Sequence, residues 1–169
     1  MEIRYWATRL AEAVAPDEID LAPFIVEAYI EGGARRAKLF EQSGRGIAGG
    51  IGAGGSAAIL AWVLQGIVAS AQWLYSILSS EGTSNFLAVI KELLGLAKEA
   101  NSKQKQRLAS MPDNPYEPLK RTIEIMATEL RDRGLPGDQA DAITLQVIYS
   151  LLEEPANAEL FVRQLESRR

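Results

Sequence analysis

The sequence predicts an all-α protein: a helical bundle with a central uncharged, glycine-rich apolar helix and a small C-terminal helical unit. Apolar residues recur at helical intervals along most of the chain. Alternating runs of β-branched residues between hairpin turns, the usual mark of strands, are missing. All 18 basic and 22 acidic side chains lie outside residues 46–80. This uncharged segment is the unusual feature of a chain whose composition, 47% hydrophobic and 24% charged, is otherwise that of a globular protein.

The N-terminal part is expected to form two helical stretches before the uncharged segment. Residues 3–14 carry apolar side chains at helical spacing, and Pro16 follows them. A second helix is predicted to begin near Pro23, because proline suits the first helical turn. It runs toward residue 40, and the pair Gly32 and Gly33 is expected to break or bend it.

A proline-rich linker at residues 111–118 is predicted to separate two regions. Residues 1–110 form an N-terminal helical region that carries the uncharged segment 46–80. Within it, Thr83 and Ser84 are candidate N-caps for a helix that follows that segment. Residues 119–169 form the C-terminal helical unit.

Three helices are expected in this C-terminal part. The first covers residues 117–133 and ends at Gly134, a residue typical of helix C-termini. Asp138 can cap the second helix, and Pro155 separates the second from the third. Short connections between amphipathic helices are typical of a small bundle.

The composition excludes several classes of function. The chain has no histidine and no cysteine, so imidazole general bases, thiolate nucleophiles, disulfides and Cys/His zinc sites are excluded. A calcium or magnesium site or an enzyme that uses only carboxylates stays open by residue type, but the acids lack metal-loop spacing. A formal net charge of −4 gives no reason to expect nucleic-acid binding. We therefore assign no catalytic, cofactor-binding or metal residue and expect a protein that is not an enzyme.

A match to the GxGxxG pattern at residues 44–49 is not interpreted as a nucleotide site. A dinucleotide fingerprint needs a strand before it and an acidic residue about 20 positions after it. Here the preceding residues indicate a helix, and the uncharged segment holds no acid.

Residues 57–78 are predicted to form one apolar helix long enough to cross a bilayer. As a straight helix they would extend about 33 Å, close to the thickness of the hydrocarbon layer. Trp73 and Tyr75 lie near one end and Arg45 precedes the other, so we expect these three side chains at the membrane interface.

A row of small and uncharged polar residues predicts a helix-packing seam. Seven of the 14 glycines lie between Gly44 and Gly55, and a helix there would cost about 5 kcal/mol relative to alanine unless packing or lipid compensates. Small residues every fourth position let helices approach closely in lipid, as in a glycine zipper. The predicted membrane and oligomer seam consists of Gly46, Gly50, Gly54, Ala58, Ala61, Gln65, Gln72 and Ser76.

Two functions are compatible with these patterns. The first is a non-enzymatic, membrane-active protein, in the manner of a bacterial toxin or an antiviral defence effector, that forms or gates a lesion or channel. Its partners would be the lipid bilayer, further copies of itself and a regulatory protein at the C-terminal helices. It would be made in the cytoplasm and associate with the cell membrane. The alternative is a soluble helical adaptor or assembly subunit whose apolar helix is buried in its own bundle or in a partner.

Overall fold

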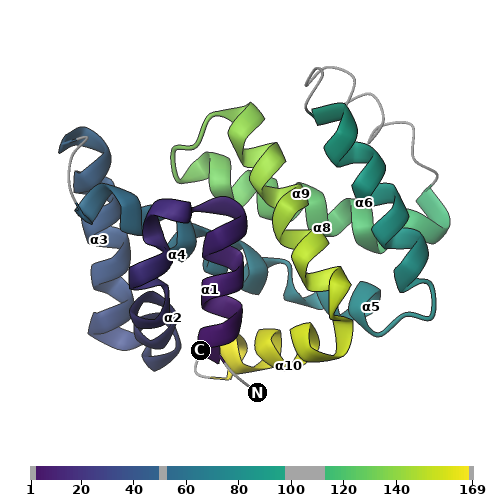
Figure 1. Ribbon diagram of the computed structural model, residues 1–169, viewed down its shortest axis with the longest axis horizontal. Coiled ribbons are helices and arrows are strands. Elements are labelled where there is room, and N and C mark those ends of the chain that lie inside the picture. The colour runs from purple at the N-terminus through teal and green to yellow at the C-terminus, as the bar shows by residue number, and fades with distance from the viewer. Residues whose placement is uncertain (1–2, 50–52, 98–112, 168–169) are drawn as a thin grey trace.

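The all-α prediction is confirmed (Figure 1). The computed structural model describes residues 3–49, 53–97 and 113–167, and the side-chain surroundings of 3–41, 59–95 and 116–167. No strand is present in these ranges. The elements are α1 (Ile3–Val14), the 3-10 helix η1 (Pro16–Leu21), α2 (Ala22–Glu31), α3 (Gly33–Gly49), α4 (Ala53–Ala69), α5 (Ala71–Leu78), α6 (Thr83–Ala97), α8 (Asp113–Asp132), α9 (Gly137–Glu153) and α10 (Pro155–Glu166).

Several helix ends lie where the sequence places them. Gly32 separates α2 from α3 with a φ of +78°, a conformation that glycine adopts without steric cost. Gly134 follows α8 with a φ of +116°, and the next amide, that of Leu135, donates to the Leu130 carbonyl at 3.2 Å. Pro155 begins α10. The predicted breaks at glycine and proline are thus confirmed.

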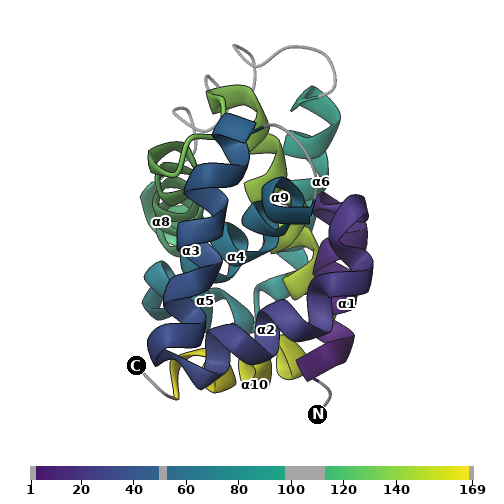
Figure 2. The same cartoon turned by 90° about the vertical axis from the view of Figure 1, so that its left-hand side faces the viewer.

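Helix α4 forms the centre of the bundle. It contacts α1, α2, α3, α8, α10 and η1 as well as α5, and in Figure 2 helices α1 and α8 lie on opposite sides of it. Side chains that point in different directions around the helix axis are all buried. They are Leu60, Ala61, Trp62, Val63, Leu64, Ile67 and Val68. A helix that is apolar all round is expected to be buried on all sides, either in a core or in a membrane.

The apolar segment is not one straight helix, so the expectation for residues 57–78 is corrected. Helix α4 ends at Ala69 and α5 begins at Ala71, with a 75° bend between Ile59–Ala69 and Ala71–Leu78. Among the described residues, no single helix is both long and apolar enough to cross a bilayer; this bent pair meets the criterion only when its two helices are taken together.

The two predicted regions share one hydrophobic core. Residues 113–118, expected in the linker, form the first turns of α8, and residues 111–112 lie outside the described part. Trp6 of α1 stacks on Phe161 of α10, with ring centroids 5.6 Å apart. Buried residues from both sides of the predicted boundary belong to a single cluster.

Gly66 lets α8 approach α4 closely. A Cβ built on Gly66 would lie 2.9 Å from Cγ of Met126, which is shorter than a normal van der Waals contact. A Cβ added to Gly95 of α6 would have no neighbouring atom within 4 Å. The two helical glycines therefore differ in packing.

We expect Gly66→Ala and Gly95→Ala to change stability in opposite directions. The alanine at residue 95 should raise the free energy of unfolding by about 0.5–1 kcal/mol through helix propensity. The alanine at residue 66 has the same propensity gain, but overpacking against Met126 should cost about 1–3 kcal/mol. Urea denaturation monitored by circular dichroism measures both. Equal stabilisation by the two variants would contradict the close approach of α4 and α8.

Candidate functional site

The candidate site is the uncharged pair of helices α4 and α5 with the helices that hold them. In α4, Ala61 of the predicted seam is fully buried. Gln65 is half-buried, and its Oε1 accepts a 2.6 Å hydrogen bond from the hydroxyl of Tyr29 in α2. The backbone amide of Leu60 donates to the buried carboxylate of Glu18 at 3.0 Å. In this structure α4 therefore uses its polar positions for contacts inside the bundle.

Helix α5 exposes a face that carries no charge. Among residues 59–79, the part of this segment whose side-chain surroundings the structure describes, the solvent-exposed side chains are Ala69, Gln72, Ser76 and Ser79. Trp73 is partly exposed. An exposed helix face in a soluble protein usually carries charged residues, so burial in the bundle does not account for this composition.

The bend divides the predicted seam. Gln65 lies on α4, whereas Gln72 and Ser76 lie beyond the bend on α5, so these three side chains do not form one straight row. Gly46 belongs to α3, and both Gly54 and Ala58 belong to α4, but the surroundings of these three residues are outside the described part.

Two further predicted residues also fall outside what the structure describes. Gly50 lies between the described ranges, and the side chain of Arg45 is not among those described. The interaction of the seam with lipid or with a second copy stays a prediction.

Tyr75, predicted at a membrane interface, contacts α10 in this structure. Its hydroxyl donates a hydrogen bond to a carboxylate oxygen of Glu166. The guanidinium of Arg163 lies over the ring, 5.0 Å from its centroid, and also pairs with Glu159 at 2.7 Å. These contacts hold α5 against α10.

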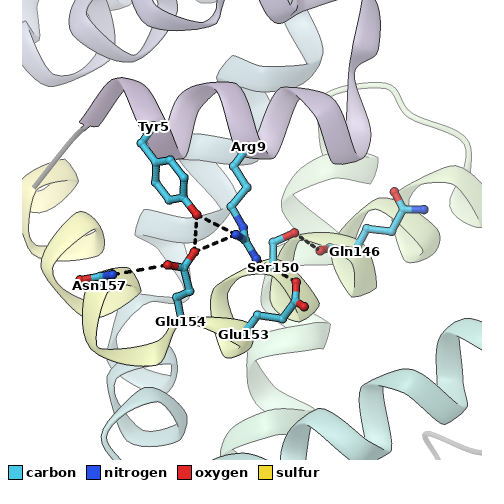
Figure 3. A network of polar contacts seen from close by, with 7 residues as sticks. All are labelled: Tyr5, Arg9, Gln146, Ser150, Glu153, Glu154 and Asn157. Carbon is cyan, nitrogen blue, oxygen red and sulfur yellow. Dashed lines mark hydrogen bonds and ion pairs between the residues drawn. The ribbon is translucent and has the colours of Figure 1, made fainter.

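A polar network that the sequence analysis did not identify joins α1 to the junction of α9 and α10 (Figure 3). Arg9 pairs with Glu154 at 2.7 Å and with Glu153 at 2.8 Å. The Tyr5 hydroxyl donates to the same Glu154 oxygen and accepts from Arg9 at 2.8 Å. The other carboxylate oxygen of Glu154 accepts a hydrogen bond from the side-chain amide of Asn157 at 3.5 Å. No short sequence motif predicts this network, because Arg9 and Glu154 lie 145 residues apart in the chain.

The network favours the ionised forms of two of its members, Glu154 and Arg9. The hydrogen bond from Tyr5 and the positive charge of Arg9 lower the pKa of Glu154, in spite of some desolvation. Burial lowers the pKa of Arg9, but Tyr5 and the two carboxylates outweigh it, so that pKa is raised. Both groups are therefore charged in the folded protein near neutral pH.

The described residues contain no group of three or more Asp or Glu side chains arranged to hold a metal ion. No family profile, curated protein or solved structure matches the chain.

We expect the link between Tyr5 and Glu154 to stabilise the fold at neutral pH and to lose its effect in acid. Because the folded-state pKa of Glu154 lies below its ordinary value of 4.5, the stabilisation is present above that value and is lost as the pH falls through the folded-state pKa. Tyr5→Phe removes the largest cause of the shift. Its deficit in free energy of unfolding relative to the unchanged protein should shrink between about pH 5 and pH 3.

Tyr116→Phe is the matched control, because the Tyr116 ring packs edge-on against Phe86 and is remote from the network. Its difference from the unchanged protein should not shrink in acid. Urea unfolding at a series of pH values measures both variants. A deficit for Tyr5→Phe that is constant over this pH range would contradict the expected pKa shift of Glu154.

Proposed function

We propose that this chain is a non-enzymatic, membrane-active protein that stores its uncharged segment inside a helical bundle. On release, the segment would enter a bilayer and self-associate to form or gate a lesion or channel. The observation that carries the proposal is the absence of charge on both faces of α5, the buried one and the exposed one. A bilayer requires this on both faces, whereas a soluble bundle requires it only on the buried face.

The length of the helix pair supports the same function. Residues 59–78 would form a helix of about 30 Å if α4 and α5 were joined without a bend, which matches the hydrocarbon layer. Inside the bundle the axes of the two helices differ in direction by 75°, so they do not form one straight helix. The packed protein is thus interpreted as the stored form, and the membrane form requires the bundle to open.

The C-terminal helices are placed to restrain the segment. Helix α8 contacts both α4 and α5, and α10 contacts both as well. A protein partner that drew α8 or α10 away would uncover α4. We therefore propose that the C-terminal helices regulate release, in agreement with the role that the sequence analysis expects for them.

A second candidate function is favoured by the enclosure of α4. Because residues 60–68 of this helix, apart from the half-buried Gln65, are buried by their own chain, the protein needs no bilayer to cover them. A soluble adaptor or assembly subunit, which binds other proteins through its outer helices, would have the same packed form. The two candidates differ in whether α4 ever leaves the bundle.

Cysteine labelling distinguishes them, because the chain contains no cysteine of its own. Ala61→Cys places a thiol at a fully buried position of α4, and Gln72→Cys places one at an exposed position of α5. In buffer, a water-soluble maleimide should label residue 72 at least tenfold faster than residue 61. With vesicles of phosphatidylethanolamine and phosphatidylglycerol, an environment-sensitive fluorophore attached at residue 72, which is exposed in the bundle, should shift to the emission of an apolar environment while the vesicles leak dye.

The adaptor function predicts a different result. Labelling at residue 61 would stay slow with and without vesicles, no dye would leak, and the protein would stay monodisperse and apart from the lipid on flotation. That combination would overturn the membrane function. The Asp132→Cys protein, with a thiol at an exposed position of α8 outside the uncharged segment, controls for general effects of lipid on the thiol and its label.

A leucine at residue 54 tests the seam. Small side chains every fourth residue permit close helix packing in lipid, and leucine removes that approach. Gly54→Leu should therefore keep membrane binding but lose most dye release and the crosslinked oligomer. Gly95→Leu, at an open helical position outside the uncharged segment, is the control and should keep both. Unchanged oligomers and dye release in the Gly54→Leu protein would exclude the seam.

A further inference from the structure

The break between α4 and α5 is confined to a single residue. The Ser70 amide donates to the Gly66 carbonyl at 3.1 Å, so the helical hydrogen bonds of α4 continue up to Ser70. The Leu74 amide donates to the Ser70 carbonyl at 3.0 Å, so the pattern of α5 starts from the same residue. Helical hydrogen bonding thus stops and resumes at Ser70, although the axis turns by 75° there.

The local sequence does not demand a break. Sharp helix kinks usually occur at proline, at glycine-serine pairs or where a side chain inserts into the hydrogen-bond ladder. Residues 67–73 contain neither proline nor glycine, and Ala69 and Ala71, on either side of Ser70, are strong helix formers. The cause of the bend must therefore be a side chain or the surrounding helices.

The Ser70 hydroxyl bonds back to the preceding turn of α4. It is fully buried and donates to the Gly66 carbonyl at 2.8 Å, with the Ile67 carbonyl at 3.3 Å. The Gly66 carbonyl thus accepts from both the amide and the hydroxyl of Ser70, and a serine hydroxyl that bonds back to the preceding turn in this way often bends a helix. Ser70 thus stabilises the bent form from within.

The contact between α5 and α10 stabilises the bent form from outside. Tyr75 donates to Glu166 and lies under Arg163, so it fixes the direction of α5 one turn beyond the break. A helix that continued straight from α4 would carry Tyr75 away from α10, because the two axes differ by 75°. The bend and the contact at Tyr75 therefore depend on each other.

We propose that Ser70 is a hinge and the Tyr75 contact with α10 is its latch, such that α4 and α5 straighten into one helix over residues 59–78 when the latch opens at a lipid surface. This inference deepens the membrane function proposed above and rests on it. Straightening continues the helical hydrogen bonds of the backbone across residue 70, and a bilayer requires these bonds to be satisfied within the segment. It also converts two helices that are too short to span into one that is long enough.

Distance measurement between two spin labels tests the hinge. With labels at Ile59→Cys and Ser79→Cys, the rise per residue and the 75° bend give a backbone separation of about 24 Å in the bent form and about 30 Å in a straight helix. We expect the shorter distance in buffer and an increase of about 6 Å with leaking vesicles of phosphatidylethanolamine and phosphatidylglycerol. Labels at Arg121→Cys and Asp132→Cys, two exposed positions of the unbroken helix α8, should keep their separation of about 16 Å.

The outcomes separate the hinge from the function. Vesicle leakage with an unchanged distance between residues 59 and 79 would overturn the hinge and leave the membrane function in place. No leakage and no change in distance would overturn both. An equal change in the α8 pair would indicate general unfolding and would also overturn the hinge.

Two substitutions test what holds the bend. Tyr75→Phe keeps the ring under Arg163 but removes the hydroxyl that bonds Glu166, and Ser70→Ala removes the hydroxyl that bonds back to α4. Each should accelerate vesicle leakage on the order of fivefold, the factor that corresponds to one lost hydrogen bond in the stored form. Tyr116→Phe, which lies on another helix, should leave the rate unchanged. Slower or unchanged leakage in both variants, with folding verified by circular dichroism, would contradict the latch and hinge.

Discussion

The enclosure of helix α4 is the constraint on which the rest of the structure depends. Leu60, Val63, Leu64 and Ile67 have no exposed surface on one face of the helix, and Ala61 and Trp62, which point in other directions, are buried as well. Full burial of each such side chain contributes about 1.5–3 kcal/mol, so α4 accounts for a large share of the hydrophobic stabilisation. Neighbouring helices must be present on all its sides at once, and this requirement sets their arrangement around one core.

Polar contacts between the outer helices fix the positions of these helices around α4. The Arg9 network ties α1 to the start of α10, and the Tyr75 contact ties α10 to α5. Arg131 of α8 pairs at 2.7 Å with Asp141 of α9, whose side chain is only 6% exposed. Pairs near the surface are individually weak. They therefore determine the register of the helices, while the apolar contacts of α4 supply most of the stability.

The sequence predicts those features of the fold that have a local cause. The ends of α1 and the breaks at Gly32 and Gly134 follow from periodicity and from backbone conformations that glycine favours. The bend at Ser70 was not predicted, because a serine between alanines is compatible with a continuous helix and only the tertiary arrangement selects the bent form. The Arg9 network was missed for a related reason: ion pairs between distant segments leave no pattern in the sequence. Of the candidate site, the sequence identified the uncharged segment but not its neighbours.

If the proposed membrane function holds, the energetics of release would explain how one segment serves both as a stable core and as a membrane element. Moving α4 from the bundle into water would expose at least four large aliphatic side chains, at about 1.5–3 kcal/mol each. This cost is comparable to the whole stability of a typical domain, about 5–15 kcal/mol. A bilayer removes most of the cost, because its interior is as apolar as the core. A trigger then has to overcome mainly the polar contacts of the outer helices and the buried hydrogen bond from Leu60 to Glu18. Under the proposed function, a segment stored in this way would be stable in water and would be released only where lipid can receive it.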